Sequence, residues 1–158
     1  MRKGLQILES QIGKKLENGL IQSFYLDSEI IDLVNVLYLK FDNWIQVTTT
    51  DETSIRKIEE NYPEKISSWI TDDNVKFEYP MSEIEKMNSN FTSYKNKILT
   101  AFSELTEIKY NQITCGLKLY FENDLTLIIY SNAEEETYLK FDGIIPNDMA
   151  EKTLYNTV

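Results

Sequence analysis

Carboxylates are almost the only side chains in this chain that could do acid–base or metal chemistry. The chain has no histidine and one cysteine among its 158 residues. Without imidazole it lacks the usual general base near neutral pH, the base of Ser-His-Asp and Cys-His arrangements, and the commonest ligand of zinc and iron. No GxGxxG or Walker A pattern is present to cradle phosphates. The sequence therefore predicts a protein that is not an enzyme and that carries no metal or other cofactor.

Two acidic runs remain as candidates for a cation site or an acid–base pair: Asp72-Asp73 and 134–136. Their spacing does not match an EF-hand loop, so a solvated loop is the favoured reading. Cys115 has no positive neighbour in the sequence to activate its thiol, which favours a small buried apolar residue.

The acidic side chains are spread along the whole chain, whose net charge is −10. Residues 1–80 carry 14 acidic and 9 basic side chains, and residues 81–158 carry 12 and 7. Such a surface repels nucleic-acid phosphates and attracts a basic protein partner, whose encounter it speeds. The alternative is that the charge only keeps the protein soluble.

Aromatic side chains at a predicted hairpin tip supply a candidate binding site. Trp44 is not needed for a turn, and tryptophan and tyrosine anchor many interfaces. An acidic aromatic patch around it would suit arginine and lysine. Trp44 folded back into the core is the alternative. The predicted partner-binding residues are Trp44, Asp42, Tyr38 and Tyr130, with Glu134, Glu135 and Glu136 as steering charges.

Two similar stretches must position these residues: LYLKFDNWIQV at 37–47 and LKLYFENDLTL at 117–127. They align without a gap at an offset of 80 and share four identities. Apolar residues at every second position predict strands, and the polar residues between them predict turns. We therefore expect hairpins at about 36–49 and 116–130. Either a duplication or the convergence of two amphipathic hairpins explains the likeness.

The apolar pattern also predicts the register of each hairpin, because a three-residue loop keeps the apolar side chains on one face. The loops are expected at 42–44 and 122–124, with a positive φ at Asn43 or Trp44 in the first. The predicted facing pairs are Phe41–Ile45 and Leu39–Val47 in the first hairpin, and Leu119–Leu127 and Leu117–Ile129 in the second.

Apolar residues spaced by three and four predict helices at about 3–18 and 82–109. Ser82 followed by Glu85 gives the second helix a capping box. Alternation predicts further strands at 75–79 and 137–141, and the polar tail from Asn147 reads as a helical turn. The first 20 residues resemble an amphipathic helix more than a signal peptide, and no apolar run is long enough for a membrane span.

Together these elements predict an α+β fold of two layers. An antiparallel sheet built from the two hairpins would be covered by the two helices. Residues 1–158 would form one domain, with two pseudo-repeated halves, 1–80 and 81–158, as the alternative.

The text LKLYFENDLTLIIYSNAEEE at 117–136, with the N-terminal helix, the acidity and the absence of histidine, resembles bacterial immunity proteins. These belong to polymorphic-toxin and contact-dependent inhibition systems. The resemblance implies a small cytoplasmic protein that binds a toxin domain, often a basic nuclease, and blocks it. The single cysteine also fits a reducing cytoplasm.

The leading hypothesis is thus a non-enzymatic inhibitor of the immunity type that neutralises a basic toxin domain, without direct binding to nucleic acid or membranes. One alternative is a structural or adaptor protein that self-associates, for example as a homodimer. Another is a small-ligand binder or enzyme that uses carboxylates. A deep pocket with paired carboxylates would favour the last of these.

Overall fold

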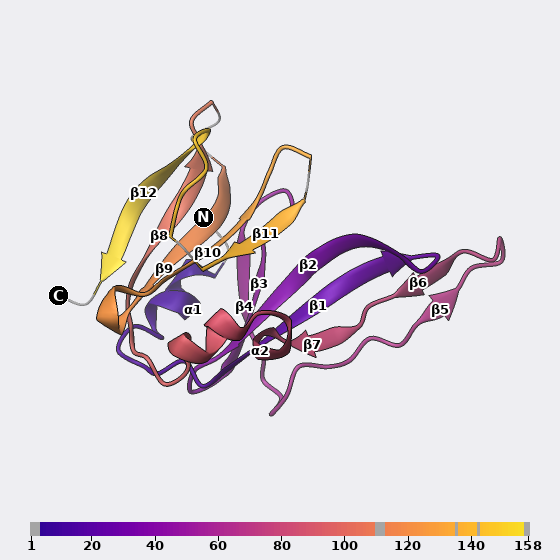
Figure 1. Cartoon of the computed structure of the whole chain (residues 1–158), viewed down its shortest axis with the longest axis horizontal. Helices are drawn as coiled ribbons and strands as arrows, with labels where there is room; N and C mark the ends of the chain where they lie inside the picture. The colour runs from indigo at the N-terminus through magenta and orange to yellow at the C-terminus, as the bar shows by residue number, and fades with distance from the viewer. Residues whose placement is uncertain (1–3, 110–112, 135, 142, 157–158) are drawn as a thin grey trace.

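The computed structural model describes residues 4–109, 113–134, 136–141 and 143–156. It shows two antiparallel sheets with short helical segments between them (Figure 1). Strands hold 51% of the described residues and helical segments 12%. The predicted α+β fold, one sheet covered by helices, is therefore wrong, and the protein is mostly β.

The first sheet is formed by the N-terminal part of the chain. Its strands are β1 (Asn18–Leu26), β2 (Glu29–Lys40), β3 (Trp44–Thr48), β4 (Ser54–Lys57), β5 (Trp69–Ile70), β6 (Lys76–Glu78) and β7 (Met81–Glu83). They follow the order β4-β3-β2-β1-β6-β5, and β7 pairs with β1 beside β6.

The second sheet is formed by the C-terminal part. Its strands are β8 (Leu99–Glu107), β9 (Thr114–Phe121), β10 (Thr126–Ser131), β11 (Thr137–Lys140) and β12 (Met149–Asn156), in the order β11-β10-β9-β8-β12. The helical segments are α1 (Leu5–Glu9), α2 (Ile84–Met87), and the 3-10 segments η1 (Ser89–Tyr94) and η2 (Glu122–Asp124).

The two hairpins lie in different sheets, and their apolar faces meet in one core. Leu37, Leu39, Ile45 and Val47 from the first hairpin and Leu117, Leu119, Leu127 and Ile129 from the second are all buried in this cluster. Each sheet thus covers the apolar face of the other, a role that the sequence analysis had assigned to helices. The strands predicted at 75–79 and 137–141 are confirmed as β6 and β11.

The register of the second hairpin is as predicted, and that of the first is not. Leu119 pairs with Leu127, and Asn123 in the loop has φ 63°. In the first hairpin Leu39 pairs with Ile45, which is a slip of two residues from the prediction. The loop is therefore 41–43, and neither Asn43 nor Trp44 has a positive φ. A slip of two keeps the same face buried, so the face was predicted correctly although the pairing was wrong.

The long helix predicted at 82–109 is wrong. Only α2 and η1 form there, Asn96 has φ 66°, and β8 follows. The helix-like spacing has two causes within β8. A register irregularity between Leu99 and Ala101 places Leu99 and Phe102 on the same core face, and Leu105 lies in a different cluster on the opposite face. A strand that is irregular and buried on both faces can thus mimic helical periodicity. Ser82, the expected cap, lies in β7.

The other two helical predictions also fail. The described part of the N-terminal segment is helical only through α1, and Gly13 has φ 91°. Residues 13–16 then run beside 96–99, where the Gly13 N–H donates to the Leu99 carbonyl at 2.8 Å. The tail from Asn147 forms strand β12, which pairs with β8.

Candidate protein-binding site

A projecting arm is the most distinctive feature of the surface. It consists of the distal halves of β1 and β2 with β5, β6 and their connections, residues 24–33 and 69–79, and it extends away from the two-sheet body (Figure 1). Tight turns shape it: Asp27 and Ser28 join β1 to β2 with positive φ, and Asn74 lies in the turn before β6 with φ 64°. The Asp27 carboxylate accepts a hydrogen bond from the Lys76 N–H at 2.8 Å, which ties the two hairpins of the arm together.

A row of aromatic rings crosses the arm. Trp69 stacks on Phe77 with ring centroids 4.2 Å apart, Phe77 on Phe24 at 6.0 Å, and Phe24 on Tyr79 at 5.3 Å. Cross-strand aromatic pairs of this kind stabilise a narrow sheet that has no second sheet to pack against.

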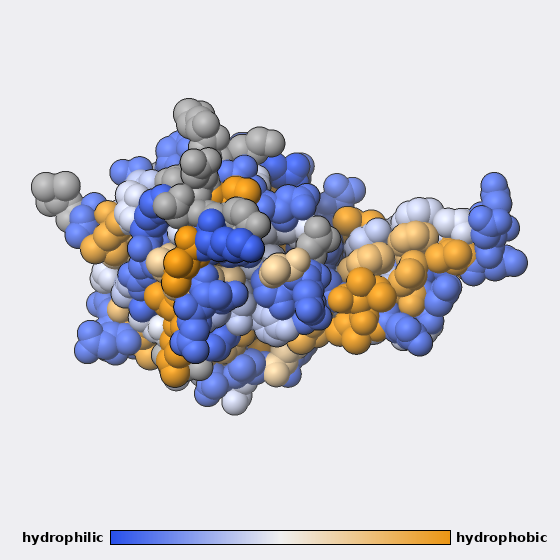
Figure 2. All heavy atoms as spheres, turned by 90° about the horizontal axis from the view of Figure 1, so that it is seen from above, coloured by the Kyte–Doolittle hydropathy of each residue, from blue (hydrophilic) through white to orange (hydrophobic). Residues whose placement is uncertain are grey.

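Apolar side chains remain exposed on the arm. The more exposed ones are Ile30, Ile31, Leu33, Trp69 and Ile70, between 46% and 63% exposed. Figure 2 shows hydrophobic side chains gathered over the arm. Contiguous exposed apolar surface of this kind marks interaction sites in soluble proteins.

At the root of the arm lies a groove of about 370 Å³. One wall is β2 from Ile30 to Val34, the other is 136–141 with β11, and α2 closes one side with Ile84 and Met87. Pockets of this volume typically bind a small molecule or a few side chains of a partner.

Two carboxylates line this groove, Asp32 and Glu136. The Asp32 carboxylate accepts a hydrogen bond from the Val34 N–H at 3.3 Å. It also accepts hydrogen bonds from the backbone N–H and the hydroxyl of Thr137. Burial raises the pKa of Asp32 above its ordinary value, and the negative charge of Glu136 raises it further, while the hydrogen bonds oppose the rise. Glu136 in turn accepts a hydrogen bond from the Tyr138 hydroxyl, which raises the pKa of that tyrosine. The groove therefore holds concentrated negative charge beside apolar walls.

The predicted anchors Trp44 and Tyr38 are buried together elsewhere. They form a small cluster with Leu20 and Ile58 on the outward face of the first sheet, where Trp44 is 4% exposed and makes a T-shaped ring contact with Tyr62. This placement agrees with the alternative prediction, in which Trp44 packs inside the protein.

The other predicted site residues do not join Trp44 in one patch. The Asp42 carboxylate forms an ion pair with Lys14 at 2.7 Å. Tyr130 lies on the outward face of the second sheet, where it stacks on Tyr138 at 5.3 Å. Hydrophobic clusters on two different sheets thus hold Trp44 and Tyr130 apart.

The acidic run lies in the loop between β10 and β11. The Asn132 side chain accepts hydrogen bonds from the backbone N–H groups of Glu134 and Glu136, both at 3.0 Å, and so shapes this loop. Glu134 is exposed, Glu136 lines the groove, and Glu135 lies outside the described residues.

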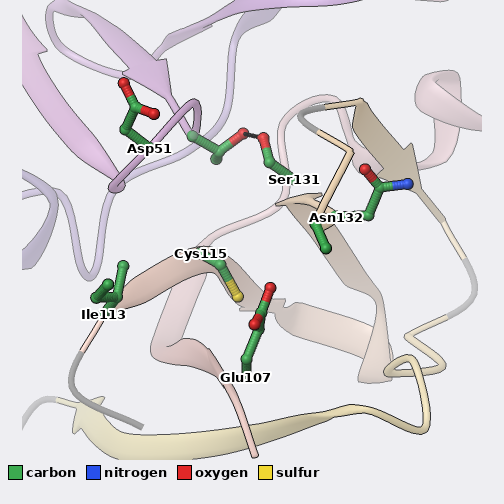
Figure 3. A pocket seen from close by; sticks show the side chains of 8 residues that line it. Asp51, Glu107, Ile113, Cys115, Ser131 and Asn132 are labelled. Atoms are coloured by element: carbon green, nitrogen blue, oxygen red, sulfur yellow. Dashed lines mark hydrogen bonds between the residues drawn. The ribbon is translucent and has the colours of Figure 1, made fainter. Parts of the chain in front are cut away.

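A second pocket, of about 200 Å³, lies beside Cys115 (Figure 3). In this view the Cys115 thiol and the Glu107 carboxylate point toward one another from β9 and β8. Burial, and then the charge of Glu107, raise the pKa of Cys115 to about 11, so the thiol is protonated and poorly nucleophilic. Thr49 and Ser131 exchange a hydrogen bond at 2.5 Å at the pocket wall. Over the described ranges, no cluster of three or more acidic or cysteine side chains could hold a metal ion.

Sequence reasoning missed the arm and the groove. It interpreted 27–32 as a polar turn with an apolar tail, whereas β2 begins at Glu29. The available signal was the text EIIDLV, in which Ile30, Ile31 and Leu33 place apolar side chains on both faces of a strand next to a turn. The same text is typical of a fully buried strand, so it could not indicate exposure.

Fold and site define a mostly β protein of two packed sheets with an exposed apolar arm and an acidic groove. Comparisons of the chain with family models, with curated proteins and with solved structures find no match. In the part of the chain that the structure describes, no helix has the length and apolar character to cross a membrane.

Proposed function

We propose that the protein is a non-enzymatic binding protein, an inhibitor of the immunity type that neutralises a basic toxin domain. The observation that carries the proposal is the projecting arm, whose exposed apolar surface continues into an acidic groove. An arm of this kind costs solubility and adds little to the core, so its natural use is to be buried by a partner.

The mechanism follows from the charge and the shape. The net charge of −10 steers a basic partner to the surface and raises the association rate. Burial of apolar anchors on the arm then slows dissociation. Trp69 and Ile70 take the anchoring role first assigned to Trp44, because they are 48% and 63% exposed while Trp44 is buried.

The test is a purification of partners from a lysate of the source organism with three full-length baits. These are the wild type, the arm variant Trp69→Ala/Ile70→Ser, and the control Leu154→Ser, which removes an apolar side chain of intermediate exposure, 57%, from β12. We expect one basic protein to be retained by the wild type and the control and lost from the arm variant. Expression of that protein alone should arrest growth, and co-expression with the wild type should relieve the arrest.

Three results would contradict the proposal. The partner could bind the arm variant as tightly as the wild type, it could be harmless when expressed alone, or the bait could recover only itself. The last result would favour the self-associating adaptor.

A further inference from the structure

The groove at the root of the arm runs along two strand edges. Five consecutive residues of β2, from Ile30 to Val34, line one wall, and the three residues from Thr137 to Leu139 line the other. Successive side chains of a strand point to opposite faces, so a surface that touches all of them lies along the strand edge. The groove is therefore a slot between the edges of two sheets.

The two strands meet at the slot, where the Asp32 carboxylate of β2 accepts hydrogen bonds from the Val34 N–H and from Thr137 of β11. β2 pairs with β3 only from Leu37 to Lys40, so among the described residues no strand is paired with its outer edge from Glu29 to Val36, although β11 packs against β2. β11 is the last strand of its sheet.

The side chains of the slot select what a segment bound there must carry. Its apolar walls, with Ile84 and Met87 at one side, suit apolar side chains. Its charged side chains are Asp32 and Glu136, and no lysine or arginine is among its described lining residues. A cation placed between these carboxylates would offset their mutual repulsion and the cost of keeping Asp32 half-buried.

A second copy of this chain fits the slot poorly. Each copy carries a net charge of −10, and pairing of the two β2 edges would bring Glu29 and Asp32 of one copy near the same carboxylates of the other. Inward-pointing charges on an edge strand are a common means by which proteins avoid self-association. The charge pattern thus favours a foreign, basic strand.

We infer that the slot between β2 and β11 receives an extended segment of the partner protein that carries a lysine or arginine between apolar side chains. The inference rests on the proposed function and adds to it the part of the partner that is recognised. The cation lies beside Asp32 and Glu136, and the apolar side chains lie against Ile31, Leu33 and Met87.

The test uses the full chain with isotope-labelled isoleucine, leucine and methionine methyl groups, titrated with two capped eight-residue peptides. One peptide alternates valine with lysine, and its matched control alternates valine with glutamate. We expect the lysine peptide to shift the methyl signals of Ile30, Ile31, Leu33 and Met87 and to leave that of Leu154 unchanged. The glutamate peptide should leave all of them unchanged.

Charge-neutral variants of the same shape locate the cation. Asp32→Asn/Glu136→Gln should weaken the lysine peptide at least tenfold, and Glu134→Gln, a change in the same loop outside the slot, should leave the affinity unchanged. Equal binding of both peptides, shifts that are absent from the slot, or full affinity in the double variant would each overturn the inference. The methyl spectrum without peptide reports whether each variant is folded.

Failure of this inference and failure of the proposed function give different results. If the natural partner is lost from the arm variant but still binds Asp32→Asn/Glu136→Gln at full strength, the slot is not used and the proposed function stands. If no toxic partner exists but the lysine peptide binds the slot, the proposed function fails while the selectivity of the slot remains.

Discussion

Strand β2 belongs to both the body and the arm, and its apolar residues have opposite fates in the two. Leu37 and Leu39 in the body are fully buried, whereas Ile30 and Ile31 in the arm are about half exposed, at 50% and 51%. The difference lies in what covers the strand. The second sheet covers Leu37 and Leu39 of β2. It reaches the arm only at its root, where β11 lines the groove, and most of the arm extends beyond it (Figure 1).

This difference separates residues that stabilise the fold from residues available for binding. Burial of apolar area supplies most of the folding free energy, at roughly 25 cal/mol per Å². Half-exposed residues on the arm gain only part of it, and they expose apolar surface that favours aggregation. Exposed apolar residues that add little stability and favour aggregation are therefore the ones that we expect to bind a partner.

The largest expected effect is in the body. Phe102 is fully buried, with 0% solvent exposure, and its ring stacks on that of Tyr155 with centroids 4.6 Å apart. Phe102→Ala should lower the free energy of unfolding by about 3–5 kcal/mol, because it removes buried area and leaves a cavity. Phe77→Ala in the arm should cost less than about half of that. Urea denaturation measures both, and equal losses would remove the distinction between body and arm.

The two tryptophans give the same comparison at matched chemistry. Trp44 is 4% exposed in its cluster and Trp69 is 48% exposed. Trp44→Ala should lower the free energy of unfolding by about 3 kcal/mol, and Trp69→Ala by less than about 1 kcal/mol. Fluorescence offers an independent check, since iodide reaches only the exposed indole. Quenching by iodide should be nearly lost in Trp69→Ala and should persist in Trp44→Ala. Quenching that depends mainly on Trp44 would mean that the arm covers Trp69.

The next comparison uses one backbone conformation that occurs in both regions. Asn123 in the body has φ 63° and Asn74 in the arm has φ 64°. Alanine at either position should strain the turn by about 1–2 kcal/mol. In Asn123→Ala the loss should appear in global unfolding by urea, because the turn joins two core strands.

In Asn74→Ala the loss should appear instead as faster amide hydrogen exchange within the arm. The arm has few buried contacts, so it can open locally without unfolding the body. An equal drop in the urea midpoint for both variants would show that the arm and the body unfold as one cooperative unit.

The sequence predicted best the elements that follow a strict two-residue period. The second hairpin has loop residues that accept a left-handed turn, Asn123 and Asp124, and its register was predicted correctly. The first hairpin has Trp44 where the second has Asp124. Because Trp44 packs on the outward face with Tyr38, strand β3 begins at Trp44 and the loop moves back by one residue. That packing is tertiary, and no local pattern revealed it.

The sequence predicted worst the elements whose neighbours decide their form. β8 is irregular and buried on both faces, so its apolar spacing imitated a helix. For the candidate site, Glu136, predicted as a steering charge, lines the groove, whereas Trp44, predicted as an anchor, is buried. Whether Trp44 or Trp69 is exposed depends on which strands lie over it, and strand order between distant segments cannot be derived from local periodicity. The duplication of the two halves stays a hypothesis. The topology is consistent with it, since each half contains a four-stranded meander, β1 to β4 and β8 to β11.

The smallest expected change in stability is at the junction of arm and body, at Asp32. Its pKa is raised in the folded protein by burial and by the charge of Glu136. The native state therefore keeps this proton at a pH where the unfolded chain has lost it, so the ionised carboxylate opposes folding. This burden is complete above the raised pKa, and it disappears as the pH falls through that value toward and below the ordinary range of aspartate. Asp32→Asn should then raise the urea midpoint slightly at pH 7, and the difference from the wild type should vanish near pH 3.

The same substitution should act in the opposite direction on binding. The asparagine keeps the shape and an acceptor for the Val34 N–H, but it removes the charge that attracts a cation to the slot. A variant that is slightly more stable and binds the lysine peptide less tightly would identify Asp32 as a residue that costs stability for recognition. If Asp32→Asn instead lowers stability at pH 7, the hydrogen bonds of the ionised carboxylate outweigh its burial. Asp32 would then belong to the body, where polar groups stabilise the fold, and the boundary of the arm would move outward along β2 past this residue.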